Sequence, residues 1–119
     1  MVIGVQDSDR ALFQQAVSNL VSNAIAHTQP GGQIDIAATA KDRHIIISVK
    51  DTGCGIPADH LPHVFERFYR VDKARSRDQG GTGLGLSIVK HIVQAHGGEV
   101  RAESVLGEGT TFFFTVAKA

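Results

Sequence analysis

Three polar side chains recur at a spacing of four residues near the start of the chain, namely Asn19, Asn23 and His27. On a helix this spacing places them in one row, at the rim of an apolar stripe. An amide oxygen is a hard ligand that suits Mg²⁺, an ion often shared with phosphate oxygens. The row therefore suggests a metal and phosphate site. Taken alone, it is more typical of boundary asparagines that satisfy nearby backbone groups.

A second candidate, Asp51, ends a hydrophobic run and is followed by Thr-Gly-Cys-Gly. A strand would hold this carboxylate in place, while Gly53 and Gly55 permit positive φ and the close approach of a flat ligand. An ionised carboxylate only accepts hydrogen bonds. It would therefore receive the exocyclic amino group of adenine and repel the carbonyl oxygen of guanine. A tight turn with an aspartate cap explains the segment equally well on its own.

The glycine-rich residues 80–87 precede a helical pattern. Free N–H groups and the positive end of a helix dipole form a natural cradle for phosphate. The segment is not a P-loop, because no Lys-Ser/Thr pair follows, and it does not fit the dinucleotide-binding pattern, because position 88 is Ile. A flexible hinge is the alternative.

Residues 66–83 lack helix or strand periodicity, and so long a structureless stretch predicts a functional lid. Five of the twelve basic residues of the chain fall within positions 67–77. Such cations could meet a triphosphate or an acidic partner, or they could simply keep a solvated loop soluble. Tyr69 and Arg70 are the sharpest candidates for contact with a ligand.

The elements that must position these groups follow from the hydrophobic pattern. Apolar residues in two adjacent rows, from Leu12 to Ile25, predict a core-facing helix. In chain order we expect a strand over 1–6, that helix over 7–27, strands over 33–40 and 44–50, a short helix over 58–65, a helix over 84–96, and strands over 99–104 and 110–116. This order predicts an α/β (α+β) two-layer sandwich, a mixed sheet of about five strands covered on one face by three helices, in a single domain over 1–119.

The composition narrows the class of function. Twelve basic and twelve acidic residues cancel, so no overall field points to nucleic acid. A single cysteine, Cys54, excludes an internal disulfide and suits a reducing compartment. No apolar run approaches the roughly 20 residues of a membrane span. We expect a cytoplasmic domain that contacts neither nucleic acid nor membrane directly.

Five motifs, in order, resemble the N, G1, F, G2 and G3 boxes of sensor histidine kinases. They are Asn-x-x-x-Asn at 19–23, Asp-x-Gly-x-Gly at 51–55, Phe-x-x-Phe-Tyr-Arg at 65–70, Gly-Thr-Gly-Leu-Gly-Leu at 81–86 and Gly-Glu-Gly-Thr-Thr-Phe at 107–112. The resemblance implies the Bergerat ATP-binding fold, shared with gyrase, Hsp90 and MutL. Each motif is weak alone, but together they span nearly the whole chain and are specific.

The resemblance implies ATP and Mg²⁺ as cofactors and assigns roles by position. Asn23 would be the main metal ligand with Asn19 beside it, and Asp51 would read the adenine amino group. The nucleotide-binding residues it implies are Asn19, Asn23, His27, Asp51, Gly53, Gly55, Ile56, Tyr69, Arg70, Gly81, Thr82, Gly83, Leu84, Gly85, Leu86 and Thr110. Arg70 is the candidate catalytic group. One position departs from the family. The residue before His27 is commonly Lys or Arg in the family, but it is Ala26 in this chain.

The resemblance also implies a mechanism. Related hydrolytic ATPases place a glutamate base where this chain has Asn19, and an amide cannot abstract a proton. We therefore expect transfer of the γ-phosphoryl group to a histidine on a separate dimerisation domain, not hydrolysis. None of the six histidines of the chain has the phosphoacceptor context. A non-catalytic nucleotide-binding module and an anti-sigma-type serine kinase are the alternatives.

The implied partners are the dimerisation domain of the same kinase and, indirectly, a response regulator, while the isolated domain is expected to be a monomer. The parent kinase is expected to be anchored in the inner membrane with this domain on the cytoplasmic side. Residues 67–72 and 88–98 resemble kinases of heavy-metal response systems. His60 and His63 are interpreted as a surface pair and not as a metal site.

Overall fold

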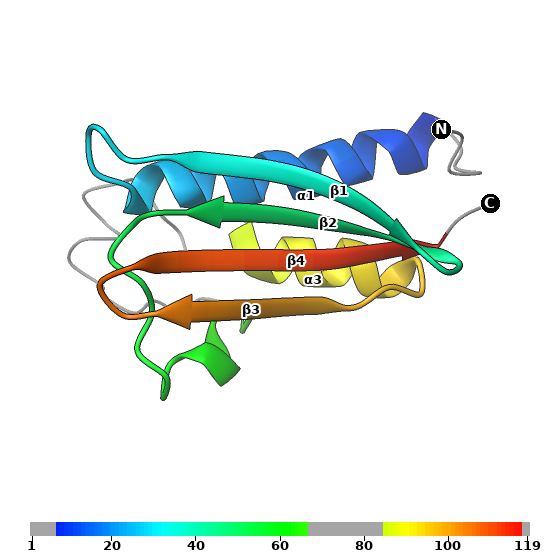
Figure 1. Ribbon diagram of the computed structural model, residues 1–119. Helices are drawn as coiled ribbons and strands as arrows, with labels where there is room; N and C mark the ends of the chain where they lie inside the picture. The colour runs from blue at the N-terminus through cyan, green and yellow to red at the C-terminus, as the bar shows by residue number, and fades with distance from the viewer. Residues whose placement is uncertain (1–6, 67–84, 118–119) are drawn as a thin grey trace.

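The computed structural model describes residues 7–66 and 85–117. Its elements, in chain order, are α1 (Asp7–His27), β1 (Ile34–Lys41), β2 (His44–Asp51), the 3₁₀ helix η1 (Leu61–His63), α3 (Gly85–Ala95), β3 (Val100–Val105) and β4 (Gly109–Ala117). Figure 1 shows the strands side by side with the two α-helices behind them. The α+β two-layer architecture expected from the sequence is confirmed.

The four strands form one sheet in the order β1-β2-β4-β3, and every neighbouring pair is antiparallel. β2 and β4 are therefore central, although α3 and β3 lie between them in the chain. The register sets Asp51, the last residue of β2, opposite Thr110 near the start of β4. Residues directly opposite each other point to the same face of a sheet. Asp51 and Thr110 are consequently neighbours on one face.

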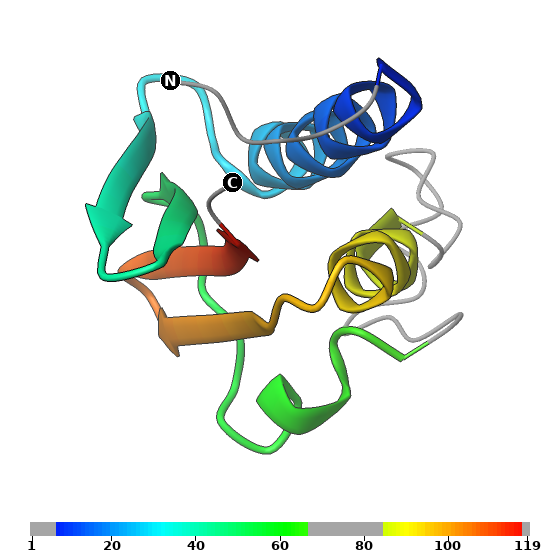
Figure 2. The ribbon, with the colours of Figure 1, turned by 90° about the vertical axis from the view of Figure 1, so that its right-hand side faces the viewer.

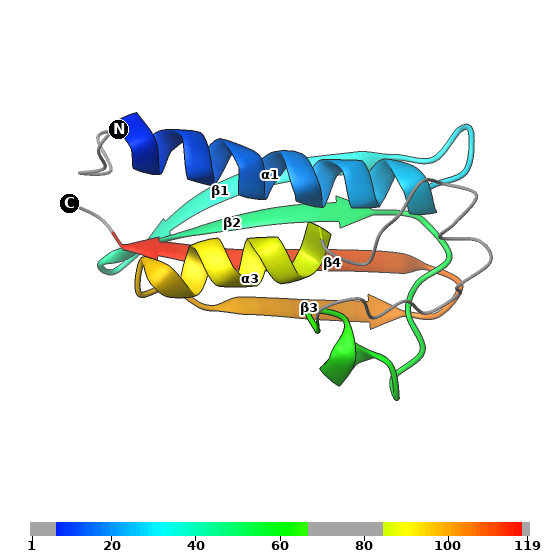
Figure 3. The ribbon, with the colours of Figure 1, turned by 180° about the vertical axis from the view of Figure 1, so that it is seen from behind.

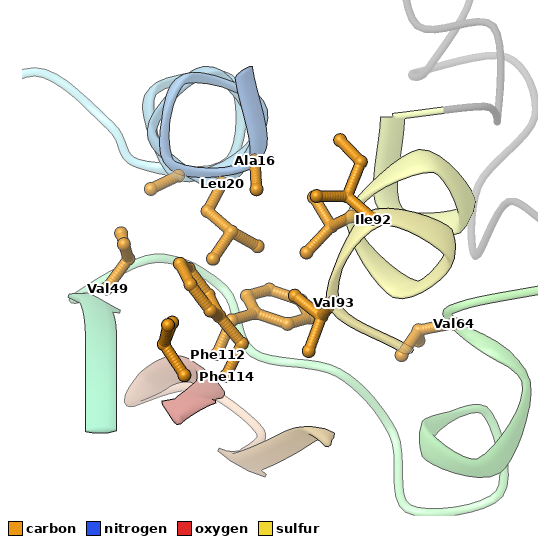
Figure 4. Close-up of a cluster of buried hydrophobic side chains, with 11 residues drawn as sticks. Ala16, Leu20, Val49, Val64, Ile92, Val93, Phe112 and Phe114 are labelled. Atoms are coloured by element: carbon orange, nitrogen blue, oxygen red, sulfur yellow. The ribbon is translucent and has the colours of Figure 1, made fainter. Parts of the chain in front are cut away.

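The two α-helices of the described residues lie on the same face of the sheet, as Figures 2 and 3 show. A buried row on α1, made of Ala16, Leu20 and Ala24, faces the sheet. It meets Val89, Ile92 and Val93 of α3 and the rings of Phe112 and Phe114 of β4 (Figure 4). Burying a side chain of the size of Leu or Phe contributes roughly 1.5–3 kcal/mol. This cluster is what fixes α1 and α3 relative to the strand ends.

The C-terminal end of α3 is anchored by a glycine pair. Gly97 adopts a φ of 78°, a conformation that favours glycine. The N–H of Gly98 donates to the Val93 carbonyl at 2.9 Å and the N–H of Gly97 donates to that of Gln94 at 3.1 Å, the pattern of a Schellman motif. Because a helix rises by a regular step per residue, this anchor also helps to determine where the first residue of α3, Gly85, lies.

Three expectations about the elements are corrected. In the described part of the chain the sheet has four strands and is antiparallel, not mixed, and two α-helices cover it, not three. Residues 58–65 form turns around η1, because Pro62 lacks an N–H and its ring would clash inside an α-helix. The predicted strand over 1–6 and all of the predicted lid except Glu66 lie outside the described residues. Within them, no helix is long and apolar enough to cross a membrane.

The predicted apolar stripe on α1 is wrong at its two ends. Leu12 and Ile25 are exposed, by 37% and 61% respectively. A spacing of four residues drifts around a helix of 3.6 residues per turn. By the ends of α1 this drift has carried both side chains well away from the direction of Leu20.

Candidate functional site

Those polar groups singled out in the sequence that the structure describes lie toward one end of the molecule. The C-terminal end of α1, the last residue of β2 and the turn between β3 and β4 lie together there, on the left in Figure 1 and on the right in Figure 3. Antiparallel pairing of β2 with β4 brings the two strand ends together. The packing of α1 on the sheet supplies the third side.

Asp51 is a buried carboxylate, 2% exposed. Its Oδ1 accepts a hydrogen bond from the N–H of Gly53 at 2.8 Å, the one hydrogen bond of this side chain to the described residues. In the same part of the chain, every side-chain oxygen or nitrogen atom sealed from solvent has a partner. Oδ2 is therefore not sealed, and it can accept a hydrogen bond from a ligand.

Gly53 lets the end of α1 come close to Asp51. A Cβ at this position would lie 2.2 Å from the backbone oxygen of His27 and 2.9 Å from Oδ1 of Asp51. No side chain fits into that space, so only glycine permits the approach. Gly55 makes a similar contact with the turn between β3 and β4, because a Cβ there would lie 2.5 Å from the Val105 carbonyl oxygen.

The row of Asn19, Asn23 and His27 runs along the site, and all three residues are half-buried. At one end, the Nδ2 of Asn19 donates to the carbonyl of Gly85 at 3.3 Å, which joins α1 to the first residue of α3. At the other end, the backbone of His27 meets Gly53. Asn23 lies about 6 Å along the helix from each neighbour in the row. The row thus connects the carboxylate end of the site to the helix start.

Two amide oxygens along this row remain open. The carbonyl of Gly85 can only accept, so the Asn19 amide must turn its nitrogen toward it, which leaves its Oδ1 without that partner. The side chain of Asn23 forms no hydrogen bond with the described residues. These are hard, neutral oxygens of the kind that Mg²⁺ accepts alongside water and phosphate.

Ser104 belongs to the site but was missed in the sequence. Its hydroxyl lies 2.9 Å from the carbonyl oxygen of Gly109, 2.9 Å from the hydroxyl of Thr110 and 2.7 Å from the backbone nitrogen of Ile56. One signal was available, because Ser104 shares an inward-facing strand position with Val100 and Ala102. A hydroxyl among apolar inward positions needs partners, and here those partners are parts of the site.

The remaining predicted residues divide into two groups. Ile56 and Leu86 are half-buried against the core, while Gly85 is the exposed first residue of α3. The other group lies outside the described residues and comprises Tyr69, Arg70, Gly81, Thr82, Gly83 and Leu84.

The predicted surface histidines form no metal site in the described part of the chain. His63 is exposed, with its Nδ1 2.5 Å from Oε2 of Glu66. Within residues 7–66 and 85–117, no three His, Cys, Asp or Glu side chains converge as metal ligands.

Comparisons with known proteins agree with this geometry. Residues 8–119 match the family model described as histidine kinase-, DNA gyrase B-, and HSP90-like ATPase. Over 110 residues the chain is 48% identical to the sensor histidine kinase WalK of Bacillus subtilis. The aligned residues are 91% of this chain but 18% of WalK. The chain therefore spans less than a fifth of that relative's length.

Solved structures show the same similarity. A mycobacterial sensor histidine kinase, MprB, superposes with a TM-score of 0.83 at 34% identity, covering 96% of this chain and 76% of that one. Full-length ShkA in complex with AMPPNP gives a TM-score of 0.77 at 34% identity, covering 91% of this chain and 22% of ShkA. None of these names bears on heavy-metal response systems, so that resemblance stays a prediction.

Proposed function

Because the chain belongs to the family of histidine kinase-, DNA gyrase B- and HSP90-like ATPases, we propose that its site binds ATP with Mg²⁺ and presents the γ-phosphoryl group to a histidine on a separate dimerisation domain. The observation that carries the proposal is Asp51, a buried strand-end carboxylate with one oxygen held by Gly53 and the other open. The proposed domain comprises residues 1–119, with an ATP lid over 66–83.

At the carboxylate end, Asp51 selects the base. Its open oxygen accepts a hydrogen bond from the exocyclic amino group of adenine, while a guanine carbonyl in the same place would face a second acceptor. Thr110 lies beside Asp51 in the β2–β4 register. Gly53, Gly55 and Ile56 form the neighbouring wall. The bound AMPPNP of the related ShkA supports an adenine nucleotide as the ligand.

At the helix end, Asn19 and Asn23 would hold Mg²⁺ together with phosphate oxygens. The fit rests on two half-buried amides with open oxygens. When bound, the ion neutralises phosphate charge and orients the triphosphate. The first N–H groups of α3, from Gly85 and Leu86 onward, also favour phosphate, because a helix start offers unpaired N–H groups and the positive end of the helix dipole.

The proposed outcome is phosphoryl transfer, not hydrolysis. A water-activating base would be needed at position 19, and the Asn19 amide cannot take a proton. The amide instead donates a hydrogen bond to the carbonyl of Gly85 and so helps to position the start of α3. Transfer of a phosphoryl group depends mainly on positioning and charge neutralisation, so this domain can hold ATP while another supplies the nucleophile. Arg70, with Tyr69 and residues 81–84, is proposed to close over the phosphates.

The proposal extends to the rest of the kinase, because relatives such as WalK are far longer than this chain. We propose the histidine-bearing dimerisation domain as direct partner, a response regulator as indirect partner and a cytoplasmic position beneath a membrane-anchored sensor. The names of the relatives support a sensor kinase, and the chemistry of the site supports its ATP-binding half.

Incubation with the dimerisation domain of the same kinase and γ-labelled ATP tests the proposal. We expect label on that domain that is lost in acid and stable in base, as phosphohistidine is, and no label when this chain is incubated alone. Acid-stable label would contradict the proposal in favour of a serine kinase. A complete lack of label from a folded, ATP-binding sample would contradict it in favour of a regulatory nucleotide-binding module.

A further inference from the structure

The hydroxyl of Ser104 lies within hydrogen-bond distance of three polar groups at the carboxylate end of the site. It contacts the carbonyl oxygen of Gly109 at 2.9 Å, the N–H of Ile56 at 2.7 Å and the hydroxyl of Thr110 at 2.9 Å. These partners come from β4 and from the loop after β2. Ser104 therefore hydrogen-bonds to both segments.

The direction of each hydrogen bond follows from counting protons. A carbonyl oxygen only accepts, so the single hydroxyl proton of Ser104 goes to Gly109. A backbone N–H only donates, so Ile56 donates to Ser104. With its own proton used, Ser104 can only accept from Thr110. Thr110 therefore donates its hydroxyl proton to Ser104.

This assignment has a consequence for the ligand. Thr110 is buried and lies opposite Asp51 on the same face of the sheet. Because its proton is committed to Ser104, its oxygen can offer only lone pairs to a bound base or to a water beside it. The carboxylate end then presents two acceptors, from Asp51 and Thr110. Such a surface favours a base edge that carries an amino group.

We propose that Ser104 is a positioning residue that orients the Thr110 hydroxyl as an acceptor and thereby sharpens selection of an amino-bearing purine over a keto-bearing one. The inference rests on the proposed nucleotide site and names a residue that determines its specificity. Through Ile56, Ser104 also ties the loop after β2 to β3. The N–H of Gly107, in the turn after β3, donates to the Cys54 carbonyl at 2.8 Å and makes a second tie to the loop after β2.

Calorimetric titration of the whole chain with ADP and with the 6-keto analogue IDP, both with Mg²⁺, tests this role. Ser104→Ala frees the Thr110 proton, which can then donate to the keto oxygen. We expect ADP affinity to fall about tenfold, as for the loss of one or two buried hydrogen bonds. The ratio of ADP affinity to IDP affinity should fall at least about fivefold. A purely structural role would lower both affinities equally and leave the ratio unchanged.

A double-mutant cycle shows whether the effect passes through Thr110. In a Thr110→Val background, Ser104→Ala should change the ADP-to-IDP ratio less than about twofold. Ser48→Ala is the matched control, because Ser48 is half-buried on β2 and its hydroxyl bonds to no described residue. Should Ser104→Ala unfold, Ser104→Cys keeps the shape of the side chain with a larger atom and exchanges the hydroxyl for a weak donor. It should also lower the ratio.

An unchanged ratio in Ser104→Ala, or an equal change with and without the Thr110 hydroxyl, would overturn the role of Ser104. Both results leave the proposed function standing if the wild-type chain still binds ADP. A folded wild-type chain that binds neither nucleotide would overturn the proposed function itself. The two failures are therefore distinguishable within one set of titrations.

Discussion

Asp51→Asn should lower the affinity of the chain for ADP by about a hundredfold or more, as expected when a buried charged acceptor is lost. The amide can keep the hydrogen bond from Gly53 on its oxygen. It must then direct its NH₂ group toward the ligand, where it meets the amino group of adenine donor to donor. Calorimetry with ADP and Mg²⁺ measures the loss directly.

The matched control for this change is Asp35→Asn. Asp35 is exposed on the edge strand β1 and makes no hydrogen bond or ion pair through its side chain with the described residues. Its replacement removes the same charge and should leave ADP affinity within about twofold of wild type. Both variants should unfold cooperatively. An Asp51→Asn protein with wild-type affinity for ADP would remove this carboxylate from base recognition.

Asn23→Ala should weaken nucleotide binding only when Mg²⁺ is present. Losing one metal ligand of a small site should lower ADP affinity in Mg²⁺ by about tenfold or more, and phosphotransfer by at least as much. In EDTA, where no ion bridges the amide and the phosphates, the variant should match wild type. The measurement is a pair of ADP titrations, with and without Mg²⁺, followed by the labelling assay with the dimerisation domain.

Gln15→Ala is the control for the effect of alanine on α1. Gln15 is exposed on the same helix and is also an amide. Alanine is the strongest helix former, so neither change should weaken the fold. If Asn23→Ala lowers ADP affinity equally with and without Mg²⁺, this result would argue against Asn23 as a metal ligand. Undiminished phosphotransfer would exclude Asn23 from the site.

Much of this fold could be predicted because its long elements have clear periods. α1 has the bounds that the pattern predicted, 7–27, and β2 and β4 match the predicted strands over 44–50 and 110–116 to within one residue at each end. Residues 58–65 were less accessible, since a short apolar pattern can resemble a helix while Pro62 prevents one. The strand order could not be predicted either, because the local hydrophobic pattern does not specify that β4 inserts between β2 and β3.

The family resemblance was confirmed, whereas the roles of individual site residues remain proposals. Motif residues such as Asp51 and Asn19 were visible because their types and spacing suggested chemistry. Ser104 was not, because the alternation of β3 places it on the inward face without showing that its partners there are Thr110 and Ile56. Sequence patterns identify groups that could bind a ligand more easily than the groups that orient them.

The central claim is that a strand-end carboxylate selects adenine. Equilibrium titration of the folded chain with ADP and with GDP, in the presence of Mg²⁺, tests it most directly. We expect measurable ADP binding and GDP affinity at least about a hundredfold lower, because the keto oxygen of guanine would face Asp51 acceptor to acceptor. Equal affinity for the two nucleotides, or no affinity for either, would contradict the account.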